Sequence, residues 1–127
     1  KIIMETSNPI VGQFVSTLMA SRTQAHIFHL QTPSFAAHMA LQAYYEGIVP
    51  LLDTIAEGIQ GRYGIITGYR MADTIREDGN PRMYFEGLCK FVETIRKQVA
   101  QDSYIQNQID TVCELINSTL YKLRFLK

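Results

Sequence analysis

The sequence lacks tryptophan altogether and has only two cysteines and four prolines in 127 residues. Two cysteines are too few for the disulfide framework of small secreted domains, and the first residues lack the layout of a secretion signal. No apolar run reaches the roughly 18 residues that a membrane span needs. We therefore expect a cytoplasmic protein that does not enter a membrane.

Excess charge of either sign is also missing, since twelve basic residues balance twelve acidic ones. Phosphate-rich partners such as DNA and RNA select surfaces with an excess of Lys and Arg. The small basic cluster near the C-terminus is typical of the last turn of a helix, where the helix dipole favours cations. Nucleic acid is therefore not an expected partner of this chain.

Charge is nearly absent from one long segment, because Arg22 is the only charged residue between Thr6 and Tyr45. A helix on the outside of a monomer normally carries charges along one face. The segment is therefore expected to be covered on more than one side, either at the centre of a bundle or at an interface between subunits. For so short a chain we favour the interface, and so a homo-oligomer.

Apolar residues at three- and four-residue steps run through most of the chain and predict an all-α protein with one domain over residues 1–127. The predicted helices span residues 9–31, 35–61, 83–101 and 104–125, with a short helix over 69–75 in the irregular connection. Pro50 is expected to kink the second helix without ending it, because the pattern resumes in register. Two helical hairpins joined by a longer crossover predict a ferritin-like four-helix bundle.

All three histidines lie near the first predicted turn. A turn near Thr32 would place His26 and His38 side by side, since each is six residues from it. His29, one turn after His26, is expected to be a surface or hydrogen-bonded side chain rather than a ligand. His26 and His38 are therefore the candidate imidazole ligands for a metal ion.

Asp53 and Glu57 are four residues apart and project from one face of the second predicted helix. Such a pair alone usually marks a solvated helix face. Here the apolar neighbours Leu52 and Ile55 predict that at least one carboxylate borders buried surface, where it needs a cation, a proton or a hydrogen bond. Asp53 follows His38 by fifteen residues, or roughly 22 Å of helix. The histidines and carboxylates can therefore meet only if two copies pack antiparallel.

These residues carry a resemblance to a known family. Ala25-His26, Phe35, His38 and the run Asp53-Thr54-Ile55-Ala56-Glu57 resemble the signature of Dps-type miniature ferritins, including the short Dps-like proteins of bacteriophages. The resemblance covers about residues 8–62. It implies an oligomer, from an antiparallel dimer to a cage, that binds iron and oxidises Fe(II) with peroxide or oxygen. The implied ligands are the two histidines of one subunit and the acidic pair of its twofold mate: His26, His38, Asp53 and Glu57. Imidazole with carboxylate suits Fe(II).

The chain departs from that family at one ligand position. The family has a further acid four residues after the second histidine, and Gln42 stands there. Glu46, one turn further on, is a candidate substitute. The departure keeps a second interpretation open, namely a non-catalytic structural or interaction protein that uses the bundle for assembly. The remaining reactive side chains, Cys89 and Cys113, are expected to be small apolar fillers that face each other in the core.

Overall fold

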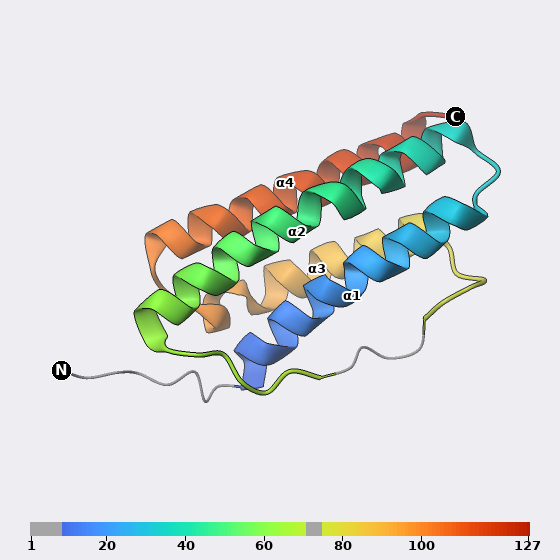
Figure 1. Cartoon of the computed structure of the whole chain (residues 1–127). Coiled ribbons are helices and arrows are strands. Elements are labelled where there is room, and N and C mark those ends of the chain that lie inside the picture. Colours follow the sequence, from blue (N-terminus) through green and yellow to red (C-terminus); the bar gives the residue numbers. More distant parts are fainter. Residues whose placement is uncertain (1–8, 71–74) are drawn as a thin grey trace.

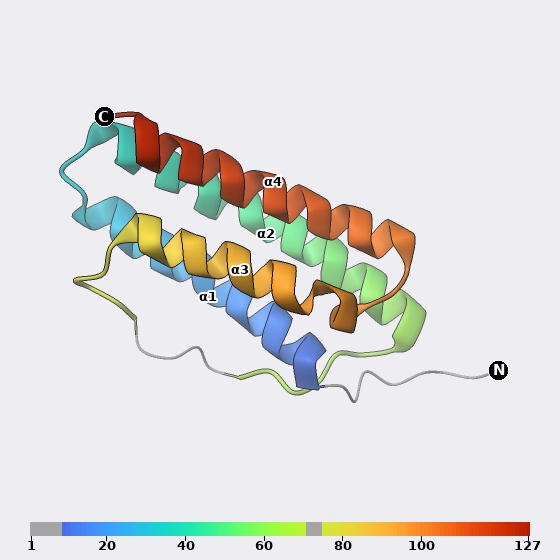
Figure 2. The same ribbon diagram turned by 180° about the vertical axis from the view of Figure 1, so that it is seen from behind.

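The computed structural model describes residues 9–70 and 75–127, which form one four-helix bundle (Figure 1). The helices are α1 (Pro9–Gln31), α2 (Phe35–Tyr63), α3 (Pro81–Val99) and α4 (Ser103–Phe125). Each helix packs against two others: α1 and α4 both contact α2 and α3 (Figures 1 and 2). The predicted all-α bundle is confirmed, and the helix boundaries agree with the predicted ones to within about two residues.

Side-chain caps start the second and third helices where the sequence changes from polar to apolar. The Ser34 hydroxyl accepts a hydrogen bond from the backbone N–H of Ala37 at 3.2 Å, and the Asn80 side chain accepts one from Met83 at 3.2 Å. Both satisfy a donor that the first helical turn leaves free. Pro50 leaves α2 continuous, as predicted, and the Thr54 hydroxyl donates to the Pro50 carbonyl at 2.9 Å.

The linker between α2 and α3 runs beside α1 in the parts that the structure describes. Gly12 of α1 touches it so closely that a Cβ there would lie 2.5 Å from the carbonyl oxygens of Thr67 and Gly68. Further along, the Arg70 backbone N–H donates to the Ser16 hydroxyl at 3.0 Å. Gly68 has φ +82°, a conformation that favours glycine.

This linker helps to explain the missing charges of α1. Because the helix contacts α2, α3 and the linker, eleven of its 23 residues are buried, including the polar Ser16 and Gln24. The segment is thus covered partly from within its own chain. The short helix predicted over residues 69–75 falls largely on residues 71–74, which lie outside the described residues.

The core contains one buried polar pair among its large side chains. Tyr44 is fully buried, and its hydroxyl lies 2.7 Å from the Ser21 hydroxyl, which donates to the Leu18 carbonyl at 2.6 Å. Burial raises the pKa of Tyr44 far above its ordinary value, so the phenol keeps its proton and donates to Ser21. Among the described helices, none is long and apolar enough to cross a membrane.

Candidate functional site

Two histidines close the turn between α1 and α2. The rings of His29 and His38 stack with centroids 3.6 Å apart and planes 21° from parallel. His29 Nδ1 lies 2.7 Å from the His38 carbonyl, and His38 Nδ1 lies 2.8 Å from the His29 carbonyl. Because a carbonyl oxygen can only accept, each Nδ1 carries a proton and donates it, and Nε2 is the ring nitrogen left for another partner.

The ring that packs against His38 is therefore the ring of His29. The sequence had predicted His26 in this place. Helix α1 continues to Gln31 and α2 starts at Phe35, so His29 and His38 lie at nearly equal distances from the connecting loop. His29 is buried and hydrogen-bonded, in agreement with its predicted role. His26 lies one turn earlier and stacks on Tyr45 with ring centroids 4.3 Å apart.

Asp53 and Glu57 lie in the second half of α2 and are both exposed, whereas their neighbours Leu52 and Ile55 are buried. The expectation that one carboxylate borders buried surface is therefore wrong for the single chain, because both project on the outer side of the helix. His38 is separated from Asp53 by roughly 22 Å of continuous helix. Within the described part of one chain, no three His, Cys, Asp or Glu side chains come together as a metal site.

The acidic pair belongs to a longer row of side chains on α2. Residues at alternating three- and four-residue steps share one face of a helix, and here that face points away from the core. We call this row the outer stripe, and it consists of Phe35, Met39, Gln42, Glu46, Val49, Asp53 and Glu57. Its apolar members are strongly exposed, with Phe35 at 76%.

The outer stripe continues an apolar surface on α1. Met19 and Leu30 of that helix are also exposed, at 49% and 71%. The nearby cation, Arg22, places its guanidinium 5.6 Å from the centre of the Tyr45 ring. The outer face of the first hairpin thus combines exposed apolar side chains at one end with two carboxylates further along.

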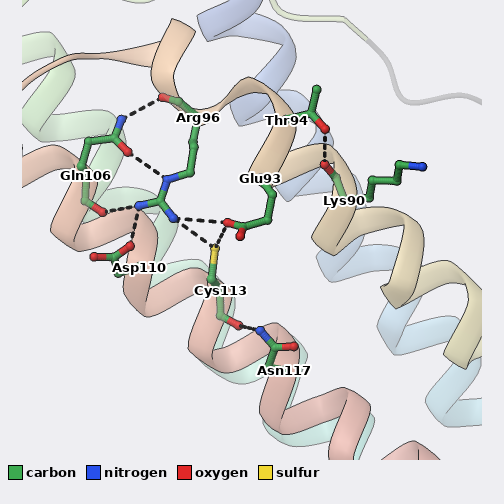
Figure 3. A network of polar contacts seen from close by, with 8 residues as sticks. All are labelled: Lys90, Glu93, Thr94, Arg96, Gln106, Asp110, Cys113 and Asn117. Atoms are coloured by element: carbon green, nitrogen blue, oxygen red, sulfur yellow. Dashed lines mark hydrogen bonds and ion pairs between the residues drawn. The ribbon is translucent and has the colours of Figure 1, made fainter.

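A second polar cluster connects α3 and α4 (Figure 3). Arg96 donates to the Gln106 side chain and backbone, both at 2.9 Å, and to Asp110 at 2.5 Å. The Cys113 thiol donates to Glu93 at 3.4 Å. Burial, together with that hydrogen bond, raises the pKa of Cys113 to about 12. Cys113 packs against the core, as expected, and is in addition a protonated member of a polar network and a poor nucleophile.

The comparison with known proteins places the chain in a family without giving it an activity. No curated protein and no solved structure matches it. A family model described as a family of unknown function, DUF5856, matches residues 29–123, about three quarters of the chain. The matched region contains His38, Asp53 and Glu57 and begins three residues after His26. The chain therefore belongs to the DUF5856 family.

Proposed function

We propose that this protein works as an antiparallel homodimer, or a larger assembly built from one, that binds Fe(II) between subunits and oxidises it with peroxide or oxygen. The ligands of one site are His26 and His38 of one subunit with Asp53 and Glu57 of the partner subunit. In the peroxide reaction the O–O bond breaks, and two electrons and two protons convert the peroxide into two water molecules. A site that holds one Fe(II) supplies one of these electrons, and a second Fe(II) ion supplies the other.

The hydrogen bond from His38 Nδ1 to the His29 carbonyl carries most of this proposal. A histidine that binds a metal commonly donates its second ring N–H to a carbonyl or carboxylate, which fixes the ring and leaves the other nitrogen for the metal. His38 has that arrangement, with Nε2 as the atom available to iron. Asp53 and Glu57 are exposed and have no competing ion pair among the described residues, so they are available to an ion at the surface.

The outer face of the first hairpin supports a second copy of this chain as the occupant. Exposed apolar side chains from both helices cover it, and an apolar face of this kind favours association. A twofold axis makes such a contact self-complementary. An axis passing midway between His38 and Asp53 brings the imidazole ligands of one copy against the carboxylate ligands of the other, so each site receives both ligand types.

The same register limits the site to one strong iron position. Gln42 offers a weaker ligand than a carboxylate. Glu46 follows His38 by eight residues, or roughly 12 Å along α2, which is too far for both side chains to hold one ion. It lies instead beside the proposed axis, next to its own copy. We therefore expect one iron ion per interface site.

A non-catalytic assembly protein is the second candidate, and one observation favours it. The ring of His29 covers a face of His38, and the reciprocal hydrogen bonds already give both histidines a structural role in the turn. If the two histidines serve only the turn, and Gln42 replaces an acidic ligand, the interface would join two subunits without binding iron. The two functions share the interface and differ only in whether the interface binds and oxidises iron.

An assay of peroxide-dependent Fe(II) oxidation distinguishes the iron-oxidising function from the assembly function. The parent protein is compared with a double variant, Asp53→Ala with Glu57→Ala, and with a matched control, Glu77→Ala with Asp78→Ala, which removes the same charge from the exposed linker. The iron proposal expects fast oxidation in the parent and the control and the protein-free rate in the first variant. A parent that matches the protein-free rate would leave only the assembly function.

A further inference from the structure

A cavity of about 400 Å³ is lined by residues of α1, of the linker and of α3, and the two helices lie side by side in Figure 2. Its lining includes Thr17 of α1, Arg76 of the linker, and Tyr84, Gly87, Leu88 and Phe91 of α3. A cavity of this size, with apolar walls and a few polar groups, is typical of sites for small organic molecules. It is separate from the outer face of the first hairpin.

Gly87 opens the cavity from the α3 side. It lies within the helix, and a Cβ built there would meet no atom within 4 Å. Because the built Cβ meets no atom, no packing constraint among the described residues requires glycine at this position. Glycine in a helix interior is also less favourable than alanine, so helix stability does not favour it either. Its missing side chain leaves room beside Leu88 and Phe91, which form an apolar wall.

Arg76 also lines the cavity, and its backbone is held in place by two hydrogen bonds. The buried Gln24 amide donates to the Arg76 carbonyl at 2.8 Å and accepts from the Arg76 N–H at 2.8 Å. These two hydrogen bonds fix the position of the main chain without using the guanidinium. Among the described residues, that guanidinium has no ion pair.

Tyr84 supplies a second polar group to the same space. Burial raises the pKa of Tyr84 to about 12, although the positive charge of Arg76 works in the opposite direction. The phenol therefore keeps its proton near neutral pH and can donate a hydrogen bond. Within the described residues, no other group accepts that proton. A cation and a neutral donor thus line one cavity, with an apolar wall between α1 and α3.

We propose that this cavity binds a small organic acid with an apolar body, such as a medium-chain or aromatic carboxylate. The acid group lies against Arg76 and the Tyr84 hydroxyl, since a guanidinium and a neutral O–H both favour a carboxylate. The apolar body lies against Leu88 and Phe91 in the space that Gly87 leaves open. The proposal is independent of the iron site, because none of these residues lies on the outer face of the first hairpin.

Decanoate, below its micelle concentration, is the probe, with decanol as the uncharged analogue of the same length. Amide chemical shifts of the ¹⁵N-labelled protein report where each binds, and calorimetry reports the dissociation constant. We expect decanoate to shift the amides of residues 84–91 and to bind roughly tenfold more tightly than decanol, as one charge-assisted hydrogen-bonding site implies. The variant Arg76→Gln removes this preference while keeping the backbone contacts with Gln24.

Gly87→Leu fills the cavity, and its matched control is Gly61→Leu, since Gly61 is also a helical glycine with no atom near its built Cβ. We expect Gly87→Leu to weaken decanoate binding at least roughly tenfold and Gly61→Leu to leave it unchanged. The proposal is overturned if decanoate does not shift the amides of residues 84–91. Unchanged binding to Gly87→Leu, or an undiminished preference for decanoate in Arg76→Gln, would overturn it equally.

Discussion

His29 and His38 form a reciprocal pair, in which each ring nitrogen Nδ1 bonds to the backbone carbonyl of the other residue and the rings stack at 3.6 Å. The pair fastens the end of α1 to the start of α2. It also sets the direction of His38 Nε2, the atom that the iron proposal uses. One local arrangement therefore connects the stability of the turn to the geometry of the proposed site.

Removing the His29 ring is expected to destabilise the bundle. His29→Ala loses one side-chain hydrogen bond, the stacking contact and the packing of a buried ring, so we expect about 2 kcal/mol less free energy of unfolding. Urea denaturation measures the change. Thr23→Ala, an exposed substitution on the same helix, is the control. A loss of less than about 0.5 kcal/mol for His29→Ala would mean that the pair contributes little.

Two glycine substitutions are expected to change stability in opposite directions. Gly12→Ala forces a methyl group to within 2.5 Å of the Thr67 and Gly68 carbonyls, so the linker must move away from α1, at a cost of about 1–3 kcal/mol. Gly87→Ala meets no atom and gains helix propensity, so it should stabilise the bundle by about 0.5–1 kcal/mol. Thermal and urea unfolding of both variants decide this, and a stabilising Gly12→Ala would contradict the close packing of the linker.

Arg96→Lys tests the polar connection between α3 and α4. Lysine keeps the charge but lacks the planar guanidinium that donates to Gln106 and Asp110 at the same time. We therefore expect the free energy of unfolding to fall by about 1–2 kcal/mol. Arg82→Lys is the matched control, because Arg82 makes one exposed ion pair with Glu86 and should lose less than about 0.5 kcal/mol. Equal effects of the two substitutions on urea unfolding would show that the fork geometry does not matter.

The sequence predicted the helices better than it predicted the contacts of individual side chains. Helical periodicity and caps such as Ser34 are local signals, so they appear directly in the chain. The partner of His38 depends on where the turn closes, and a shift of its centre by between one and two residues exchanges His26 for His29. The contact of the linker with Gly12 is formed by residues more than fifty positions apart, which a single sequence does not reveal.

For the candidate carboxylates Asp53 and Glu57, the sequence likewise predicted the spacing but not the surroundings. Their four-residue spacing was visible in the sequence. Their burial was not, because Leu52 and Ile55 project toward the core while Asp53 and Glu57 project away from it. The cavity beside Gly87 had no sequence signal beyond a glycine inside an otherwise regular helical pattern.

The pH dependence of Cys113 follows from its surroundings. Burial and the Glu93 carboxylate raise its pKa from the ordinary 9.0 to about 12. The thiolate is therefore scarce at pH 8, and alkylation should be slow and should keep accelerating with pH well above the ordinary thiol value. Glu93→Gln removes the negative charge and should lower that pKa and speed the reaction, whereas Glu114→Gln should not. Mass spectrometry of alkylated Cys113 measures the rates, and a plateau near pH 9 would contradict the assignment.

The proposed site between subunits is tested most directly by mixing two inactive variants. One carries His26→Ala and His38→Ala, the other Asp53→Ala and Glu57→Ala, and the two are co-refolded before peroxide-dependent Fe(II) oxidation is measured. Half of the randomly formed dimers are mixed, and each mixed dimer has one intact site of two, so we expect roughly a quarter of the parent rate to return. Each variant alone should stay at the protein-free rate. A mixture that also stays at that rate would contradict a site shared between two copies of this chain.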